Sequence, residues 1–459
     1  MALPAREIPL QAARWNNRSL LHLLWPLVVE QILGVTMGIA DTVMVSSVGE
    51  YAVSGVSLVD VLNNLIILAF AALATGGSVV VSQYIGRRDI KNSTGAARQL
   101  IHANVLISVT ITAVTLILHT LILRIVYGNV EADVMKAART YFRITALSYP
   151  FLAVYNSSSA LFRSMGNSKV PMLIALLVNA INIGGNAVFI FVFHIGVTGA
   201  ALSTLISRIT AAGILLFLLK AGPYRTGPTS LKGLNFRLDP PMIRNILNVG
   251  IPSGVENSMF QFGKILVSRI FTSFGTAAIA ANAIVSVTSS LSFMPGQAFG
   301  LAILTVVGQC VGAGDYKGAK KYTAKILKLC YGVLIILNGS MLIFMRPLIG
   351  LFNLSAEAQA LARSYMWVQC INAPLFWTLA FTLPNALRAA GDVRYCMAVG
   401  IITMWIVRVS MAYILAYPMG FGSLGVWLAM GGDFITRAIF YTTRWVRGKW
   451  QYKTVIKDG

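Results

Sequence analysis

Two carboxylates in the first long apolar stretch are the residues of this chain best placed to do chemistry. Glu30 and Asp41 lie within LLHLLWPLVVEQILGVTMGIADTVMV, which covers residues 20–45. At about 100° per residue, their spacing places both on nearly the same face of a helix, roughly 16 Å apart along its axis. An ionisable group is costly inside a membrane helix, so two on one face predict an interior cavity instead of contact with lipid.

A stripe of amides accompanies these acids. Asn179, Asn182 and Asn186 fall within the apolar residues 170–193. Their spacing of three and four residues places them on one face of a helix. Beside them, a carboxylate such as Asp41 would suit ion-driven transport, because a low dielectric disfavours its free charge and it tends to hold a proton or a cation.

Structural interpretations of the same groups stay open. A membrane asparagine often hydrogen-bonds a neighbouring helix, and Asp41 could pair with a buried arginine such as Arg208 or Arg437. The second apolar stretch adds Asp60 and Asn63 near its start. Three further basic residues inside apolar stretches could pair or extend toward the membrane surface, and they receive no functional role: Lys264, Arg269 and Arg408.

The composition is that of an integral membrane protein. Of 459 residues, 56% are hydrophobic and 11% charged, whereas roughly a quarter are charged in a typical soluble domain. The net charge of +22 would indicate nucleic-acid binding in a soluble protein. Here the basic residues lie between apolar stretches, as the positive-inside rule requires, so no nucleic-acid partner is expected. Four scattered cysteines lack metal-ligand spacing and are expected to pack as small apolar residues.

Twelve apolar stretches, each long enough to cross a bilayer as a helix, follow one another along the chain. None alternates as a membrane β-strand does, so helices are the remaining way to span. The predicted spans are 20–45, 54–82, 99–123, 141–162, 170–193, 198–219, 245–272, 279–307, 322–345, 361–386, 395–416 and 423–443.

The connections between spans predict the orientation. Both tails and the even-numbered connections carry Lys and Arg, whereas the first, fifth, seventh and eleventh connections carry none. This asymmetry places both termini in the cytoplasm of a multi-pass protein of the plasma, or inner, membrane. An even number of spans requires the same result.

The chain also repeats itself. One constant offset places Pro26 on Pro252, so that PLVVE falls on PSGVE, and it also places SQYIGRRD on GQCVGAGD. A nearly identical offset places FRSMGNSKVPM on LRAAGDVRYCM. The prediction is an all-α membrane protein of twelve helices in two parallel, pseudo-symmetric six-helix bundles. We assign residues 1–225 to the N-terminal bundle, 226–240 to a cytoplasmic linker and 241–459 to the C-terminal bundle.

The repeat separates the two acids of the first span. Glu30 has a counterpart in Glu256, so a framework role shared by both halves and a role in transport remain equally open for this pair. The position equivalent to Asp41 is Val267, so only the N-terminal half has an acid there. Asp41 is therefore the more informative residue.

Enzyme chemistry is not expected. The sequence lacks HExxH, GxSxG and a Walker loop, and its four histidines are isolated. Without a nucleotide site, an ion gradient would have to drive transport. Two other functions stay open as alternatives: a flippase for lipid-linked saccharides and a membrane-embedded lipid-modifying enzyme.

Several segments resemble one transporter family. ADTVMVSSVG, SQYIGRRD, FRSMGNSKVPM, NAINIGGNAVFIF with GVTGAALST, and GIPSGVENSMF look like the multidrug and toxic compound extrusion (MATE) transporters. The resemblance runs through both halves. It implies two bundles in a V shape around a central cleft, and export of cationic amphipathic drugs in exchange for Na⁺ or H⁺.

The resemblance also implies roles for single residues. Asp41 matches the family's aspartate in the first helix, and Asn182 its neighbouring asparagine. Asn186 stands where several prokaryotic members have an aspartate, and Thr204, or Ser203, matches a hydroxyl of the same site. A proton or Na⁺ would thus be held at Asp41, Asn182 and Asn186, with Glu30 and Asn179 either lining the cleft or structural.

A second coupling or substrate site is less well matched. Glu256 matches a glutamate that some branches of the family use for coupling, but those branches also have an aspartate on the tenth helix. This chain has WVQCINAP there, with Gln369 and Asn372 and no acid. We therefore expect the N-terminal site to couple transport, in a monomer that needs no cofactor beyond H⁺ or Na⁺. Its expected partners are small cationic amphipathic substrates and the lipid bilayer.

Overall fold

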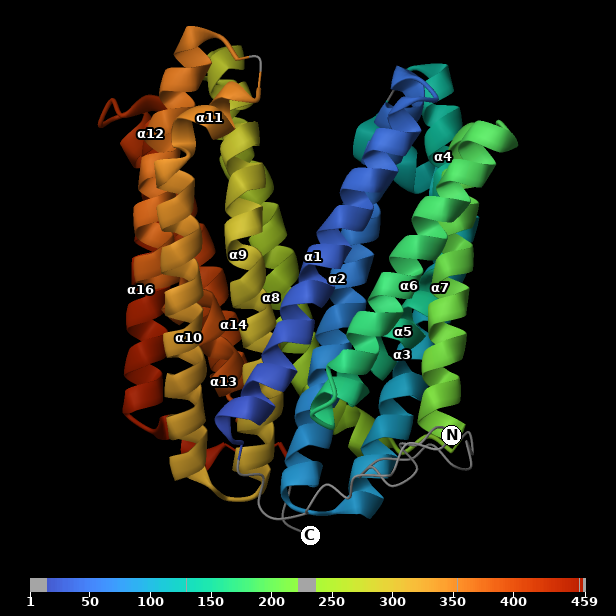
Figure 1. The fold of residues 1–459 in the computed structure, drawn as a ribbon, viewed down its shortest axis with the longest axis vertical. Helices are drawn as coiled ribbons and strands as arrows, with labels where there is room; N and C mark the ends of the chain where they lie inside the picture. Colours follow the sequence, from blue (N-terminus) through green and yellow to red (C-terminus); the bar gives the residue numbers. More distant parts are fainter. Residues whose placement is uncertain (1–14, 129, 222–236, 353, 454, 457–459) are drawn as a thin grey trace. The chain divides into compact units, whose positions relative to one another are not determined.

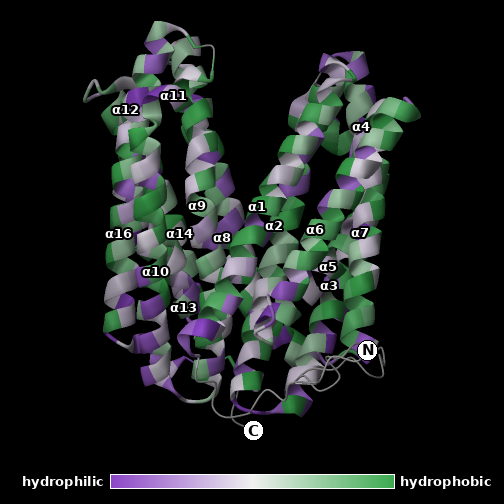
Figure 2. Ribbon diagram, viewed as in Figure 1, coloured by the Kyte–Doolittle hydropathy of each residue, from purple (hydrophilic) through white to green (hydrophobic). Residues whose placement is uncertain are grey.

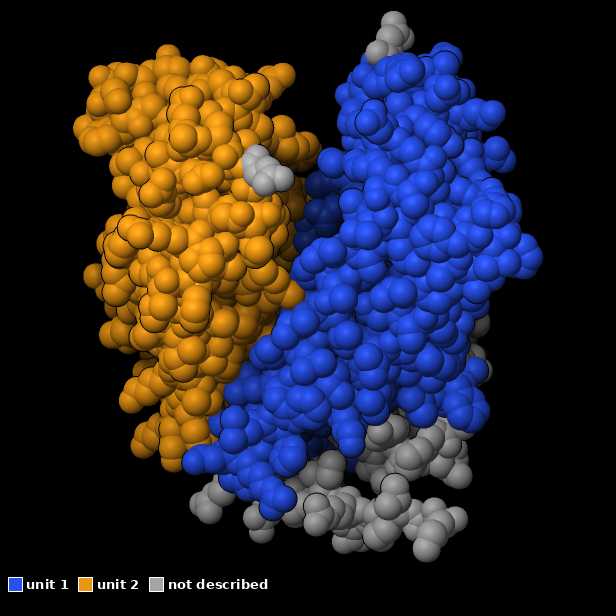
Figure 3. Space-filling model, turned by 45° about the horizontal axis from the view of Figure 1, so that its top comes forward, with its two compact units in different colours: residues 1–251 blue, residues 252–459 orange. Residues whose placement is uncertain are grey.

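The chain is almost wholly helical. The computed structural model describes residues 15–128, 130–221, 237–352, 354–453 and 455–456, and this part of the chain contains no strand. Two compact units, Met1–Ile251 and Pro252–Gly459, are coloured separately in Figure 3. They divide within helix α8. Most of the predicted linker 226–240 falls on residues 222–236, outside the described residues.

Figure 1 labels the helices in chain order. The first unit contains α1 (Asn17–Ser46), α2 (Glu50–Gly86), α3 (Ile90–Tyr127), α4 (Ala132–Leu147), α5 (Tyr149–Ser164), α6 (Lys169–Asn186) with its π-helical continuation η1 (Ala187–Val192), α7 (Gly196–Ala221) and the start of α8 (Pro240–Thr272). The second unit contains the rest of α8, then α9 (Gly275–Gly312), α10 (Tyr316–Ile343), α11 (Met345–Gly350), α12 (Ala356–Asn372), η3 (Ala373–Thr382), α13 (Pro384–Ala389), α14 (Val393–Ile402), η4 (Thr403–Val409), α15 (Ser410–Ala416), α16 (Gly422–Val446) and the short η5 (Lys449–Tyr452).

These helices have the lengths and composition of membrane spans. Nine helical segments of the described chain are long and apolar enough to cross a membrane, and hydrophobic residues recur along the long helices in Figure 2. The other three predicted spans fall on α4–α5, α8 and α16. The first of these breaks at Ser148 into two helices of 16 residues each, while α8 and α16 carry several charged side chains.

Matching positions of the two units adopt matching local structures. Asp89 and Asp315, which the sequence repeat superimposes, cap α3 and α10 by accepting a hydrogen bond from the backbone N–H three residues on. Gly166 and Gly391, a second repeated pair, both have positive φ, 80° and 93°, a conformation that disfavours other residues. The repeat read from the sequence is thus a repeat of capping and turn geometry.

Each unit has its own apolar core. In the first unit, buried side chains such as Val59, Leu123 and Phe142 pack together. In the second, Val285, Tyr365 and Trp427 belong to an equivalent cluster. These cores hold the helices whose polar faces form the sites described below.

Close helix packing predicts a pair of opposite glycine effects. A Cβ added to Gly55 would lie 2.8 Å from the Cβ of Ala137 and 2.9 Å from the backbone oxygen of Val134, whereas a Cβ on Gly95 would meet nothing within 4 Å. We expect Gly55→Ala to lower the free energy of unfolding by about 1–3 kcal/mol, because the added methyl group would clash with the backbone of α4, which can move only at the cost of its packing. Gly95→Ala should raise it by about 0.5–1 kcal/mol. Thermal unfolding of the purified protein in detergent measures both, and equal melting temperatures for the two variants would contradict this packing.

Candidate functional site

The best-supported site lies where α1 meets α6. Asp41 on α1 is half-buried, and one of its carboxylate oxygens accepts a hydrogen bond of 2.5 Å from the side-chain amide of Asn186 on α6. Asn186 is fully buried. The structure therefore brings together two of the residues that the sequence assigned to one site.

One turn before Asn186, the residue Asn182 of α6 makes hydrogen bonds to α7. The side-chain amide of Asn182 donates to the hydroxyl of Thr204 at 3.3 Å, while the hydroxyl of Ser203 donates to the backbone oxygen of Asn182 at 2.6 Å. Of the two hydroxyls considered from the sequence, that of Thr204 contacts the asparagine side chain. Asn179 differs, because its amide donates to the backbone of Ala175 within α6.

Three buried amide oxygens on this stripe accept no hydrogen bond from a described residue. The Oδ1 atoms of Asn179, Asn182 and Asn186 are buried and lack a hydrogen-bond partner among the described residues. Buried polar atoms are normally satisfied, and oxygen atoms of amides and carboxylates are the ligands that hard cations prefer. The donor set around Asp41 therefore fits a small cation or a proton. No group of three His, Cys, Asp or Glu in the described chain is arranged to hold a metal ion.

A second acid belongs to the same region. Asp60 on α2 interacts electrostatically with Asp41, and the hydroxyl of Tyr141 on α4 donates to it. Asn63, one turn further along α2, accepts a hydrogen bond of 2.7 Å from the hydroxyl of Tyr149. The sequence showed Asp60 and Asn63 near the start of the second apolar stretch, but it offered no signal for the tyrosines, which come from other helices.

Arg208 is the cation of this region. Its guanidinium donates to the hydroxyl of Ser148 at 2.7 Å and interacts electrostatically with Asp41 and Asp60. No ion pair within 4 Å joins Asp41 to Arg208 among the described residues of the first unit. The first unit therefore shows no direct pair between Asp41 and Arg208, while a pair with Arg437 stays a prediction.

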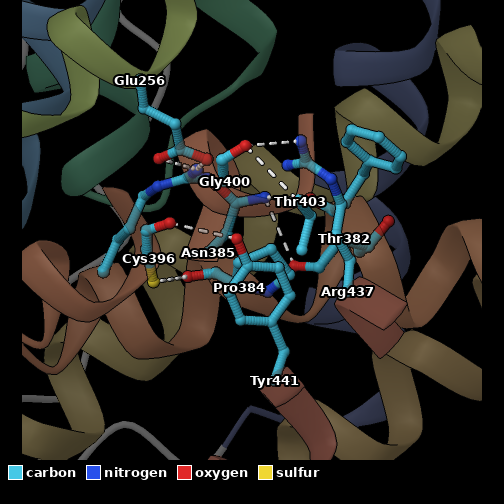
Figure 4. A network of polar contacts seen from close by, with 11 residues as sticks. Glu256, Thr382, Pro384, Asn385, Cys396, Gly400, Thr403, Arg437 and Tyr441 are labelled. Atoms are coloured by element: carbon cyan, nitrogen blue, oxygen red, sulfur yellow. Dashed lines mark hydrogen bonds and ion pairs between the residues drawn. The ribbon is translucent and has the colours of Figure 1, made fainter. Parts of the chain in front are cut away.

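The repeated glutamates are both salt-bridged. Glu30 pairs with Arg163 at 2.8 Å, and both oxygens of Glu256 accept from Nη2 of Arg388 at 2.8 Å. The sequence repeat that superimposes the two glutamates also superimposes the segments of their two arginines. Figure 4 shows Glu256 beside Gly400 in the polar network of the second unit. An ion pair made at matching positions of both units favours a shared framework role.

The other residues predicted for the second unit make no hydrogen bond to that ion pair within the described chain. Gln369 is buried, and neither polar atom of its side chain has a hydrogen-bond partner among the described residues. Asn372 donates to the backbone of Val368 within its own helix. The roles assigned to these residues stay predictions.

The contact between Asn186 and Asp41 yields a test. We expect Asn186→Ala to weaken binding of a proton or Na⁺ at Asp41 about tenfold, as loss of a group that orients a ligand commonly does. The matched control is Thr210→Ala, since the hydroxyl of Thr210 bonds only within α7. The concentration of Na⁺ or H⁺ at which the purified protein is half-saturated measures the effect. An unchanged value in Asn186→Ala would contradict a role for this amide.

The fold and its repeated units define a multi-pass helical membrane protein, and comparison with known proteins gives its family. The family model described as MatE matches the chain twice, at residues 26–188 and 252–414. The two matches begin at Pro26 and Pro252, which the sequence repeat also superimposes. The chain therefore belongs to the MATE family of transporters, as the sequence resemblance indicated.

Relatives match over nearly the whole chain. The uncharacterized transporter YisQ of Bacillus subtilis is 28% identical over 439 residues, covering 95% of each chain. The probable multidrug resistance protein NorM of Thermotoga maritima is 27% identical, covering 99% of this chain and 96% of NorM. A solved structure described as the outward-facing conformation of a multidrug resistance MATE family transporter superimposes with a TM-score of 0.90 at 19% identity, covering 98% of this chain and 99% of that one.

Proposed function

We propose that this protein is a secondary antiporter that exports amphipathic compounds with a cationic group in exchange for H⁺ or Na⁺. The observation that carries the proposal is the membrane-embedded carboxylate of Asp41, held by Asn186 next to buried amide oxygens without partners among the described residues. The names of several relatives, such as probable multidrug resistance protein, support drugs as the exported class.

The mechanism requires that ion and substrate exclude each other. In one state of the transporter, Asp41 holds the ion and the substrate leaves; in the other state, it loses the ion and the substrate binds. Such coupling works only if the two ligands stabilise different states. Asn186 would orient the carboxylate, and Asp60 with Arg208 would set the charge around it.

The membrane setting follows from the same proposal. A gradient-driven exporter of this kind would lie in the plasma membrane with both termini in the cytoplasm and would work as a monomer without a cofactor. Labelling of single cysteines placed in the two tails, from one side of intact cells, would test this orientation.

The decisive experiment imposes the two gradients separately. Full-length protein in proteoliposomes should move ethidium when a pH gradient or a Na⁺ gradient is applied, and the effective gradient identifies the ion. Ethidium movement that ignores both gradients would overturn the antiport mechanism. Turnover of a lipid-linked saccharide across the same vesicles without a gradient would instead support the flippase alternative.

A further inference from the structure

A basic pocket lies in the first unit where α3 ends and α4 begins. It has a volume of about 420 Å³ and is lined by the end of α3, by Val130 of the connection and by the start of α4. Three of the lining residues are cations: Arg124, Lys136 and Arg139. The other residues that line it are uncharged. A pocket of this size and charge suits a small anionic group.

The three cations have no acidic partner. None of them forms an ion pair with a residue that the structure describes. The acids of the same segment, Glu131 and Asp133, are exposed and do not line the pocket. The Nε atom of Arg139 is buried and also lacks a hydrogen-bond partner in the described chain. Because buried donors are normally satisfied, an oxygen atom of a ligand would complete this guanidinium group.

The second unit offers a comparison for Arg139. On α4 this arginine opens the sequence RTY, and on α12 Arg363 opens the similar sequence RSY. Arg363 is exposed, and its Nε donates to the backbone oxygen of Gln359 in its own helix at 3.3 Å. Three residues before Arg363 stands Ala360, where the first unit has Lys136. The repeat therefore does not account for the basic pocket of the first unit.

The helix that leads to the pocket has the surface of a lipid-facing span. Among the nine candidate spans of the described chain, α3 has the highest mean hydropathy and the smallest buried share. Ile117 is 77% exposed and Leu121 is 52% exposed. Both lie on the same side of α3 as Arg124, because they precede it by seven and three residues. In a bilayer, acyl chains would cover this side of the helix.

The length of this exposed side matches one leaflet. It begins at Val114, which is 47% exposed, and ten residues later it reaches Arg124. Ten residues of α-helix rise about 15 Å, which is half of the roughly 30 Å of hydrocarbon in a bilayer. A lipid whose chains lie against α3 would therefore place its head group at the level of the pocket.

We propose that this pocket binds the phosphate of an anionic phospholipid whose acyl chains lie against α3. Arginine forms paired, charge-assisted hydrogen bonds with phosphate oxygens, so Arg124 and Arg139 would hold the phosphate, and Lys136 would add a third positive charge. In the orientation proposed above, the lipid belongs to the outer leaflet. The inference depends neither on the exported compound nor on the coupling ion.

The test measures which lipid lies beside the pocket in full-length protein. A fluorophore is attached to a cysteine that replaces Ile125, which is 74% exposed on α3. The four native cysteines are buried, so the new one should react selectively. The labelled protein is reconstituted in vesicles of phosphatidylcholine that contain either nitroxide-labelled phosphatidylglycerol or nitroxide-labelled phosphatidylcholine. The ratio of quenching by the two lipids gives the preference for the anionic one.

The unaltered pocket should prefer phosphatidylglycerol about tenfold. Arg139→Gln should lower this preference about fivefold, which is the effect of one cation next to an anionic lipid. Arg139→Lys keeps the charge and should retain most of the preference. The matched control is Arg363→Gln, which removes the corresponding arginine of the second unit and should leave the tenfold preference unchanged. Quenching by labelled phosphatidylcholine should be the same in every variant that keeps its fold.

Three outcomes would overturn the proposal. The first is equal quenching by both lipids when the pocket is unaltered. The second is an equal loss of preference in Arg139→Gln and Arg363→Gln, since the preference would then come from the overall positive charge. The third is loss of the preference when inorganic phosphate replaces chloride at the same ionic strength, because the pocket would then be a site for free phosphate.

Discussion

Asp41→Asn should abolish gradient-driven export while leaving the protein folded. Asparagine keeps the size of the side chain and can still meet the amide of Asn186, but it can neither take up a proton nor neutralise a cation. Because coupling requires a group that binds the ion in one state and releases it in the other, export should fall to the rate of passive leak. Ethidium efflux from proteoliposomes, driven first by a pH gradient and then by a Na⁺ gradient, measures this.

A matched acid serves as the control for this variant. Asp133 is exposed in the first turn of α4, so Asp133→Asn should export at the wild-type rate. Ethidium binding without a gradient should survive in Asp41→Asn, since the lost step is ion exchange. Full export by Asp41→Asn would rule out the assignment of this carboxylate as the coupling group.

Glu256→Gln should cause the largest loss of stability. Arg388 would then keep its charge with its side chain only 14% exposed, and breaking a buried ion pair from one side costs about 3–5 kcal/mol. Thermal unfolding of the purified protein should therefore occur at a clearly lower temperature. Glu30→Gln should act in the same direction through Arg163, whose side chain is also 14% exposed.

A double variant separates a framework role from a coupling role. Glu256→Gln combined with Arg388→Met removes both charges, so it should recover much of the melting temperature that Glu256→Gln loses. If Glu256 serves coupling alone, Glu256→Gln would melt like the wild type and lose export. That result would assign Glu256 to transport and limit the structural role to the ion pair of Glu30.

Much of the fold could be predicted from local patterns in the sequence. Long apolar stretches must be helices in lipid, because each backbone group has to be paired within its own segment. The helices of the structure follow the predicted spans, except that the span 141–162 begins inside α4 and is broken at Ser148. The constant offset between the two halves needed only sequence identity at a few positions, among them the helix caps Asp89 and Asp315. A helix cap tolerates few residue types, so the repeat can still be recognised in the sequence.

Contacts between side chains on helices far apart in the sequence could not be predicted in the same way. The chain alone left Asp41 between an ion site and an arginine pair, and it left Glu30 and Glu256 between framework and transport. The choice depends on which side chains approach within hydrogen-bonding distance, which residue spacing on a single helix does not encode. Only the tertiary structure placed Asn186 on Asp41 and an arginine on each glutamate.

The first helix, α1, shows what the sequence determines and what the tertiary structure adds. Its sequence by itself determined that a membrane segment carries two acids on one face, because helical periodicity and the cost of burying charge are properties of the segment alone. The tertiary structure decided that Glu30 is neutralised by Arg163 and that Asp41 is held by an amide instead.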